Sequence, residues 1–175
     1  MSYDTNLRLG LWPLELARQT IHETIAKCDI ALPGLDDASQ LTGLTAPDDI
    51  ADFYLQLGVS VVALTLGAKG TLVATTQERA TIPSFPVESV DATAAGDTFD
   101  GAFLAQLLAG ASPFDAARYA NATAALSTTG MGRSRLFPHA HKLPPLWLHM
   151  ALAPLYNSGF QHWPVFRYAL IAKAG

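Results

Sequence analysis

Residues 59–66 read VSVVALTL, and this run decides the fold class. The run is rich in β-branched residues and apolar on both faces, which is typical of a parallel strand covered by helices on each side. Residues 67–70 predict a turn after this strand, because two glycines fall within four positions. Residues 71–75 and 79–82 predict two shorter strands beyond the turn.

Before this run, strands and helices alternate. Residues 3–8 predict a strand that runs into a loop, and residues 29–32 predict a short buried strand. Apolar spacing and punctuation by Pro and Gly predict helices over residues 13–28, 36–43 and 47–58. Asp36 is expected to cap the second of them.

After the hairpin, residues 93–96 form a loop of small residues that leads into an apolar helix ending near Leu108. Pro113 begins another helix, which runs to about Thr128. Strands that alternate with helices predict an α/β fold with a largely parallel sheet.

Composition excludes several classes of protein. The 175 residues suit one domain, half of them are apolar, and the net charge of -4 argues against a nucleic-acid or anionic-membrane surface. Cys28 is the one cysteine, so an internal disulfide and a multi-cysteine zinc site are excluded. The opening residues lack the pattern of a secretory signal, and no apolar run is long enough to span a bilayer. We therefore expect a soluble, cytoplasmic protein that binds neither nucleic acid nor membrane.

Residues 90–103 read VDATAAGDTFDGAF and carry the most informative chemistry. Small residues precede a helix whose first amides have no internal partners, which favours a bound anion. Asp97 stands beside that anion site, where a carboxylate suits a base that takes a proton from a hydroxyl attacking a phosphoryl group. The other interpretation is that Asp97 only caps the helix. The residues alone leave both open.

This segment resembles the second signature of the PfkB carbohydrate kinases, with matches at Asp91, Ala94, Ala95, Gly96, Asp97, Gly101 and Ala102. The resemblance implies that Asp97 is the catalytic base and contacts the sugar. It also implies that the amides of Ala94, Ala95 and Gly96 bind the transferred phosphoryl group. The expected fold is ribokinase-like, a three-layer α/β/α arrangement with a mostly parallel sheet, and the expected cofactors are ATP and Mg²⁺.

Two further stretches agree with that family in the expected order. The run TLGAKG resembles the family's nucleotide-binding turn, and its candidate ATP contacts are Thr65, Gly67, Lys69 and Gly70. Asn121 matches a position that lines the adenine pocket in relatives. Each has an ordinary alternative, because the first could be a plain β-turn and the second a solvated Asn.

The opening stretch is similar to 2-keto-3-deoxygluconate kinases within the family. It reads DTNLR from residue 4, followed by Leu11 and Trp12, and the resemblance implies that Asn6 and Arg8 contact the nucleotide and that Arg8 also contacts an acidic sugar. A guanidinium suits both carboxylate and phosphate. Where many members have Asn and Glu, this chain has Gly34 and Asp37. Asp37 is expected to hold magnesium through water, although a solvated carboxylate is the alternative.

The resemblance covers about residues 2–132 and corresponds to the family's second half, so we expect a ribokinase-like domain whose amino-terminal half is missing. Residues 1–136 are assigned to that kinase part and residues 137–175 to an atypical tail. The expected function is ATP-dependent phosphorylation of 2-keto-3-deoxygluconate, with a cut sheet edge that favours a homo-oligomer. The alternatives are a kinase for another sugar, such as ribose or fructose, and a non-catalytic remnant that binds nucleotide.

Overall fold

The computed structural model describes residues 1–130, and they fall into two compact units. The first unit is Met1–Phe85, and the second begins at Pro86. The predicted boundary between residues 136 and 137 lies outside the described residues and stays a prediction.

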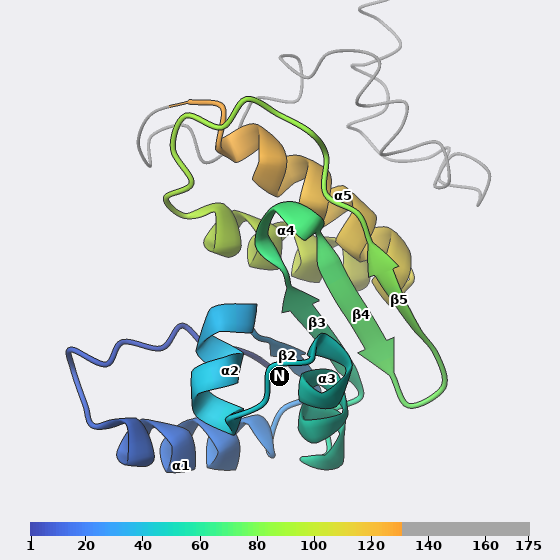
Figure 1. The fold of residues 1–175 in the computed structure, drawn as a ribbon. Helices are drawn as coiled ribbons and strands as arrows, with labels where there is room; N and C mark the ends of the chain where they lie inside the picture. Colours follow the sequence, from blue (N-terminus) through green and yellow to red (C-terminus); the bar gives the residue numbers. More distant parts are fainter. Residues whose placement is uncertain (131–175) are drawn as a thin grey trace, which may run out of the picture. The chain divides into compact units, whose positions relative to one another are not determined.

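The first unit contains a five-stranded sheet with its strands in chain order (Figure 1). The strands are β1 (Ser2–Asp4), β2 (Ile30–Leu32), β3 (Val61–Thr65), β4 (Thr71–Thr75) and β5 (Arg79–Ile82). β1, β2 and β3 run parallel, with Ala31 opposite Val62, whereas β3, β4 and β5 pair antiparallel. The predicted α/β fold is confirmed, and the strand that decided it lies at the centre of the sheet.

The direction of β4 follows from the length of its connection to β3. Only residues 66–70 join the two strands, including a short 3₁₀ turn at Gly67–Lys69. Parallel neighbours need a crossover of a dozen or more residues, so a connection this short reverses the chain. β3 therefore has a parallel partner on one side and an antiparallel partner on the other.

β1 ends earlier than the sequence predicts. The strand stops at Asp4, because the Asn6 amide donates to the Asp4 Oδ1 atom at 3.1 Å and Asn6 takes a φ of 29°. A positive φ is incompatible with an extended strand. Of the predicted strand that runs into a loop over residues 3–8, the strand therefore covers only the first part, and the rest forms the connection to the first helix.

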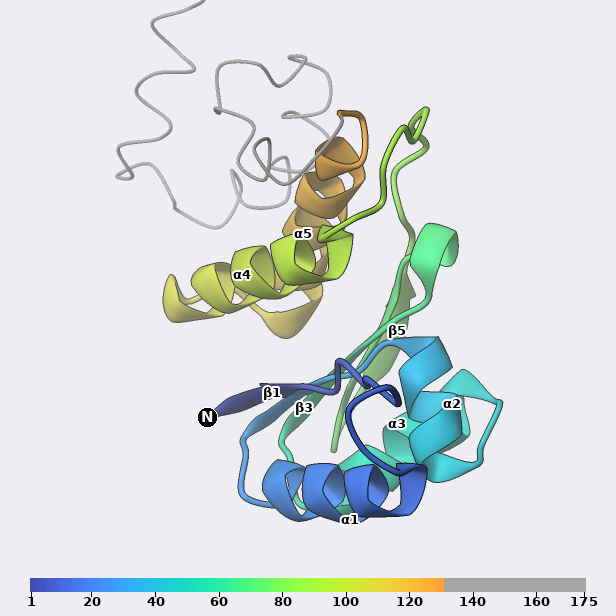
Figure 2. The ribbon, with the colours of Figure 1, turned by 90° about the vertical axis from the view of Figure 1, so that its left-hand side faces the viewer.

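Three helices cover one face of this sheet within the unit (Figure 2). They are α1 (Leu14–Ile25), α2 (Leu35–Thr42) and α3 (Pro47–Gln56), close to the predicted ranges. Ile21, Leu41, Ile50 and Leu64 are among the side chains of their shared hydrophobic core. Asp36 does not cap α2 as predicted, because Gly34 holds the N-cap position and makes no side-chain bond.

The second unit is a pair of packed helices, α4 (Ala95–Leu108) and α5 (Pro113–Ser127). Pro113 opens α5 as predicted, and the Ser112 Oγ atom caps it by accepting a hydrogen bond from the Asp115 amide at 3.2 Å. The Ser112 hydroxyl in turn donates to the Asp115 carboxylate at 2.8 Å. Among the residues that the structure describes, no helix is long and apolar enough to cross a membrane.

Gly70 is packed directly against another stretch of backbone. Its φ is 102°, and a Cβ atom added there would lie 2.1 Å from the Ile82 carbonyl oxygen and 2.6 Å from the Ser84 nitrogen. Gly67, in the same turn, has a φ of 60° but nothing within 4 Å of its Cβ position. At Gly70, both the positive φ and the close backbone exclude a larger residue, whereas at Gly67 only the positive φ disfavours one.

We expect Gly70→Ala to lower the free energy of unfolding by about 3 kcal/mol or more, because backbone atoms of the β5 end must move. Gly67→Ala serves as the matched control and should cost about 1–2 kcal/mol, the strain of a left-handed alanine. Urea unfolding of both variants measures the difference. Equal losses would contradict the packing role of Gly70.

Candidate functional site

The carboxyl ends of the three parallel strands lie at the same edge of the sheet. At this edge the Thr65 amide donates to the Pro33 carbonyl at 2.9 Å, and Gly34 forms a parallel bridge with Thr65. A Cβ added at Gly34 would be 3.7 Å from the Thr65 Oγ1 atom, an ordinary contact. Ligands of open α/β sheets bind outside the carboxyl ends of the strands. The candidate residues of the first unit therefore lie where such a site is expected.

Asp37 is tied to the connection between β1 and α1. Its Oδ2 atom accepts a hydrogen bond from the Leu7 amide at 2.8 Å, across 30 positions of sequence. Leu7 is buried, whereas Asn6 and Arg8 on either side of it are exposed. Asp37 is half-buried, and one of its oxygens anchors this connection, so it is more than a solvated carboxylate; its contact with magnesium stays a prediction.

The Arg8 guanidinium lies on the exposed side of that connection. Its Nη1 atom donates to the Leu7 carbonyl at 3.3 Å, and the structure gives it no ion pair among the described residues. An exposed guanidinium next to the strand ends is placed to meet an anion. Two hydrophobic side chains that follow it in the sequence, Leu9 and Leu11, are also exposed.

The expected nucleotide-binding turn is closed by its own backbone. The Leu66 amide donates to the Gly70 carbonyl at 2.7 Å, and the Gly70 amide donates to the Gly67 carbonyl at 3.0 Å. Lys69 is exposed at the tip of this turn, as is Gly67, while Thr65 is half-buried at its base. The stretch is a 3₁₀ turn with a positive φ at Gly67 and Gly70, and the alternatives of a nucleotide-binding turn and a plain turn both stay predictions.

The loop before α4 is bent by an alanine in the left-handed region. Ala94 is the N-cap with a φ of 62°, and the Ala95 amide donates to the Ala92 carbonyl at 3.1 Å. The Ala95 amide, expected to face an anion, is therefore engaged inside the loop. A Cβ at Gly96 would meet nothing within 4 Å, so the backbone at the helix start is open to a close approach.

Asp97 follows at once, in the first turn of α4, and its side chain is exposed. No hydrogen bond to its carboxylate is found in the described part of the chain, and the N-cap residue makes no side-chain bond. Asp91 stabilises the loop that precedes α4, because its Oδ1 atom accepts a hydrogen bond from the Thr93 amide at 2.9 Å. These contacts do not favour the capping interpretation, and they leave the Asp97 carboxylate available as a base.

Asn121 lies on α5 and is 5% exposed. The interpretation of a solvated Asn is therefore wrong, because a buried amide needs specific partners. The end of the same helix meets the loop before α4, since the amides of Val90 and Asp91 donate to the Thr128 carbonyl at 2.8 and 3.0 Å. Ala94, Gly96, Asp97 and Asn121 thus belong to one compact unit.

Residues 1–130 contain no group of three or more His, Cys, Asp or Glu side chains that could hold a metal ion. Asp37 is the one candidate for magnesium, and its Oδ2 atom already accepts from an amide. Magnesium in phosphoryl-transfer sites is held by one or two carboxylates together with phosphates and water. Asp37 therefore suits a magnesium ion that arrives bound to a nucleotide, and the described residues do not form a separate metal site.

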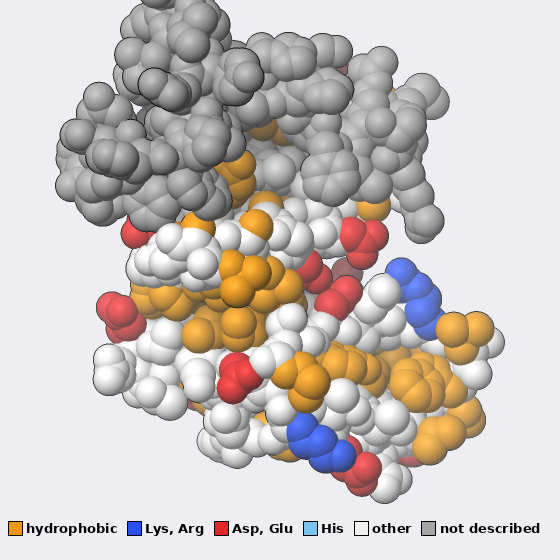
Figure 3. Space-filling model, turned by 180° about the vertical axis from the view of Figure 1, so that it is seen from behind, with side chains coloured by type: hydrophobic (Ala, Val, Ile, Leu, Met, Phe, Trp, Pro, Cys, Tyr) orange, Lys and Arg blue, Asp and Glu red, His pale blue; other side chains and the backbone are white. Residues whose placement is uncertain are grey.

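Charge on the surface is scattered. Over the described part of the face in Figure 3, Lys and Arg side chains stand apart and form no continuous basic surface. This distribution agrees with the small negative net charge of the sequence.

Three structural residues were missed at the level of sequence. The Ser112 and Asp115 pair has the spacing of a capping box, and that signal could have identified the start of α5. Tyr54 is 0% exposed with a hydroxyl that has no partner among the described residues, and no sequence signal marks it.

Comparison with known proteins gives a family match. The pfkB family of carbohydrate kinases matches residues 1–140. A 2-dehydro-3-deoxygluconokinase of Bacillus subtilis (strain 168) is 34% identical over 145 residues, which cover 82% of this chain and 45% of that protein.

Solved structures agree. Fructokinase from Vibrio cholerae O395, crystallised with fructose, ADP and calcium ion, superposes with a TM-score of 0.71 at 30% identity, covering 77% of this chain and 46% of that one. Aminoimidazole riboside kinase from Salmonella enterica, complexed with aminoimidazole riboside and an ATP analog, gives 0.72 at 28% identity, covering 87% and 52%. The chain spans about half the length of these relatives, and the expected ribokinase-like fold class is confirmed.

We expect Asp37→Ala to lower the free energy of unfolding by about 1–3 kcal/mol, because the buried Leu7 amide loses its acceptor. The neighbouring carboxylate Asp36 is exposed, so Asp36→Ala is the matched control and should change stability by less than about 0.5 kcal/mol. Urea unfolding measures both. A neutral Asp37→Ala would show that the anchor contributes nothing.

Proposed function

Because the chain belongs to the pfkB family of carbohydrate kinases, we propose that it transfers the γ-phosphoryl group of ATP to a hydroxyl of 2-keto-3-deoxygluconate. The observation that carries the proposal is the placement of Asp97. Its carboxylate is exposed in the first turn of α4, directly after an open backbone position at Gly96. A phosphate site and a base thus come from one loop.

In the proposed reaction, Asp97 accepts the proton of the sugar hydroxyl as that oxygen attacks the γ-phosphorus. The bond between the γ-phosphorus and the oxygen that bridges to the β-phosphate breaks, and ADP leaves. The amides at the start of α4, with those of Gly96 and Ala94 foremost, donate to the transferred group. The Ala95 amide contributes less than expected, since it is engaged with Ala92.

The nucleotide is assigned to two sets of residues. Thr65, Gly67, Lys69 and Gly70 are proposed to contact its phosphates together with Asn6 and Arg8, and Asn121 to line the adenine pocket. The exposure of Gly67 and Lys69 at the tip of their turn supports the first assignment, and the burial of Asn121 supports the second. Asp37 is proposed to contact, through water, a magnesium ion brought with ATP, which would neutralise phosphate charge.

An acidic sugar is favoured by Arg8. Its guanidinium is exposed and without an ion pair among the described residues, which suits the carboxylate of a sugar acid. The fructokinase and the riboside kinase similar to this chain act on neutral sugars or ribosides, so a neutral sugar is the alternative substrate. A cytoplasmic location, a homo-oligomer and the domain boundary at residue 136 stay predictions.

We expect Asp97→Asn to lower the rate of ATP-dependent phosphorylation about a hundred- to ten-thousand-fold, because the amide cannot accept the proton. Asp49→Asn changes another exposed carboxylate in a first helical turn and should leave the rate unchanged. The assay follows ADP release by the purified chain with 2-keto-3-deoxygluconate. ATP binding without turnover by the unaltered chain would contradict the proposal and favour a non-catalytic remnant.

We expect Arg8→Gln to raise the KM for 2-keto-3-deoxygluconate about tenfold, since a charge-assisted hydrogen bond is lost. The KM for fructose, which has no carboxylate, should change far less. A change in the KM for ATP would measure the proposed contact of Arg8 with the nucleotide phosphates separately. Lys27→Gln removes an exposed positive charge elsewhere in the same unit and is the control. Equal losses with both sugars would argue against an acidic substrate.

A further inference from the structure

The backbone at the end of β5 packs against the turn between β3 and β4. In the β4–β5 pair, Thr71 lies opposite Ile82. Gly70, directly before Thr71, leaves no room for a side chain, because an added Cβ atom would lie 2.1 Å from the Ile82 carbonyl oxygen and 2.6 Å from the Ser84 nitrogen. The position of residues 82–84 therefore limits where Gly70 can lie.

Gly70 takes part in both backbone hydrogen bonds that close this turn. Its carbonyl accepts from the Leu66 amide at 2.7 Å, and its amide donates to the Gly67 carbonyl at 3.0 Å. Gly67 and Lys69, the residues at the tip of the turn, are exposed, whereas Gly70 is buried. A displacement of β5 would free Gly70 and weaken both bonds together.

β5 itself has little support from burial. Three of its four residues, Arg79, Ala80 and Thr81, are exposed, and only Ile82 is buried. In the sheet of the described residues, β5 is an edge strand whose one neighbour is β4. A segment with few buried apolar contacts opens easily, so a contact from outside the sheet matters more for this strand than for a central one.

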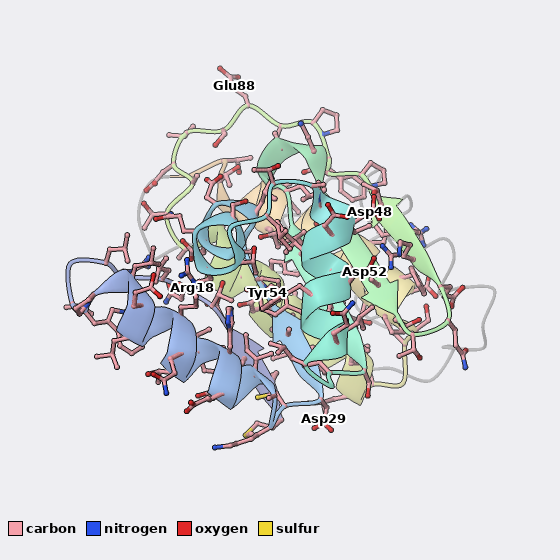
Figure 4. The ribbon with its side chains drawn as sticks, turned by 60° about the horizontal axis from the view of Figure 1, so that its bottom comes forward. Arg18, Asp29, Asp48, Asp52, Tyr54 and Glu88 are labelled. Atoms are coloured by element: carbon pink, nitrogen blue, oxygen red, sulfur yellow. The ribbon has the colours of Figure 1, made fainter. Side chains whose placement is uncertain are left out.

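Arg79 makes such a contact, because it joins the start of β5 to α3. Its Nη1 atom donates to the Asp48 Oδ1 atom at 3.0 Å, and its Nη2 atom donates to the Asp52 carboxylate. The two carboxylates are one helical turn apart and lie on the side of α3 next to β5 (Figure 4). One guanidinium thus connects an edge strand to a helix across 31 and 27 positions of the sequence.

This contact differs from an isolated ion pair on the surface, which contributes little to stability. The planar guanidinium binds two carboxylates at once, and both belong to one helix. That helix is fixed in the core, since Ile50 and Ala51 of α3 are 0% exposed. Two like charges four positions apart on a helix also repel each other, so Arg79 removes a repulsion between Asp48 and Asp52.

We infer that Arg79 is a positioning residue: by holding β5 on α3, it keeps residues 82–84 against Gly70 and so orders the turn that carries Gly67 and Lys69. The consequence for ATP affinity rests on the proposed function, in which this turn contacts the nucleotide phosphates. The ordering of the turn does not depend on that function, and it can be measured without nucleotide.

The test is Arg79→Gln, with Arg118→Gln as the matched control. Arg118 forms an ion pair in the second unit, and both arginine side chains are 35% exposed. Hydrogen–deuterium exchange followed by NMR should show the Leu66 and Gly70 amides exchanging about three- to tenfold faster in Arg79→Gln and unchanged in the control. The Gly43 amide, which donates within the first unit at the end of α2, is the internal reference and should not change.

Three outcomes overturn the inference. Unchanged exchange at Leu66 and Gly70 shows that Arg79 does not order the turn. Equally faster exchange at Gly43 shows that Arg79 stabilises the whole unit without positioning any part of it. Faster exchange confined to the Thr75 amide, which donates to the Glu78 carbonyl at the other end of β4, shows that the loosening does not reach the turn.

The carboxylates are tested by changing both Asp48 and Asp52 to Asn. Exchange at Gly70 should rise in this double variant as it does in Arg79→Gln. Adding Arg79→Gln to the double variant should change it by less than a further twofold, because the partners of the guanidinium are already altered. A full further increase shows that Arg79 acts through another group, and the inference is then wrong.

The consequence for the nucleotide is measured by isothermal titration calorimetry with ATP and Mg²⁺, which needs no turnover. Arg79→Gln should raise the Kd for ATP about threefold or more, because a disordered turn must be ordered on binding. Faster exchange at Gly70 with an unchanged Kd supports the ordering of the turn and contradicts its assignment to the nucleotide. A failure of the inference is thus distinct from a failure of the proposed function.

Discussion

The first unit depends on the central position of β3, which pairs with β2 on one side and with β4 on the other. The residues Val62, Ala63 and Leu64 are 0% exposed, so this strand contributes apolar side chains to both faces of the sheet. Its parallel partner brings the ends of β2 and β3 to the same edge, where Thr65 binds Pro33. Its antiparallel partner requires a tight reversal, and that reversal is the Leu66–Gly70 turn. One strand therefore sets the position of the turn and of the edge where Asn6, Arg8 and Asp37 are held.

In the second unit, the loop before α4 brings backbone amides and the Asp97 carboxylate close together in sequence at the start of one helix. A left-handed Ala94 turns the chain into α4 so that Gly96 stands open and Asp97 follows in the first turn. The loop would be unrestrained if only α4 held it. The amides of Val90 and Asp91 tie it to the end of α5, and Ser112 fixes the start of that helix. The proposed anion site and the proposed base thus rely on the packing of two helices.

Asp37 shows how one carboxylate can have both a structural and a proposed chemical role. Its contact with the Leu7 amide joins α2 to a connection that carries a strained Asn6.

The sequence by itself determined the α/β class, the order of the elements and the small-residue loop with Asp97, because hydrophobic periodicity and Pro or Gly punctuation are local properties. It also determined the family, through motifs in a fixed order. The tertiary structure alone decided the burial of Asn121, the anchor between Asp37 and Leu7, the engagement of the Ala95 amide and the unpaired hydroxyl of Tyr54. Most of these depend on which segments distant in sequence meet in space. Local propensity carries no information about such contacts, because they form only when the helices pack against the sheet.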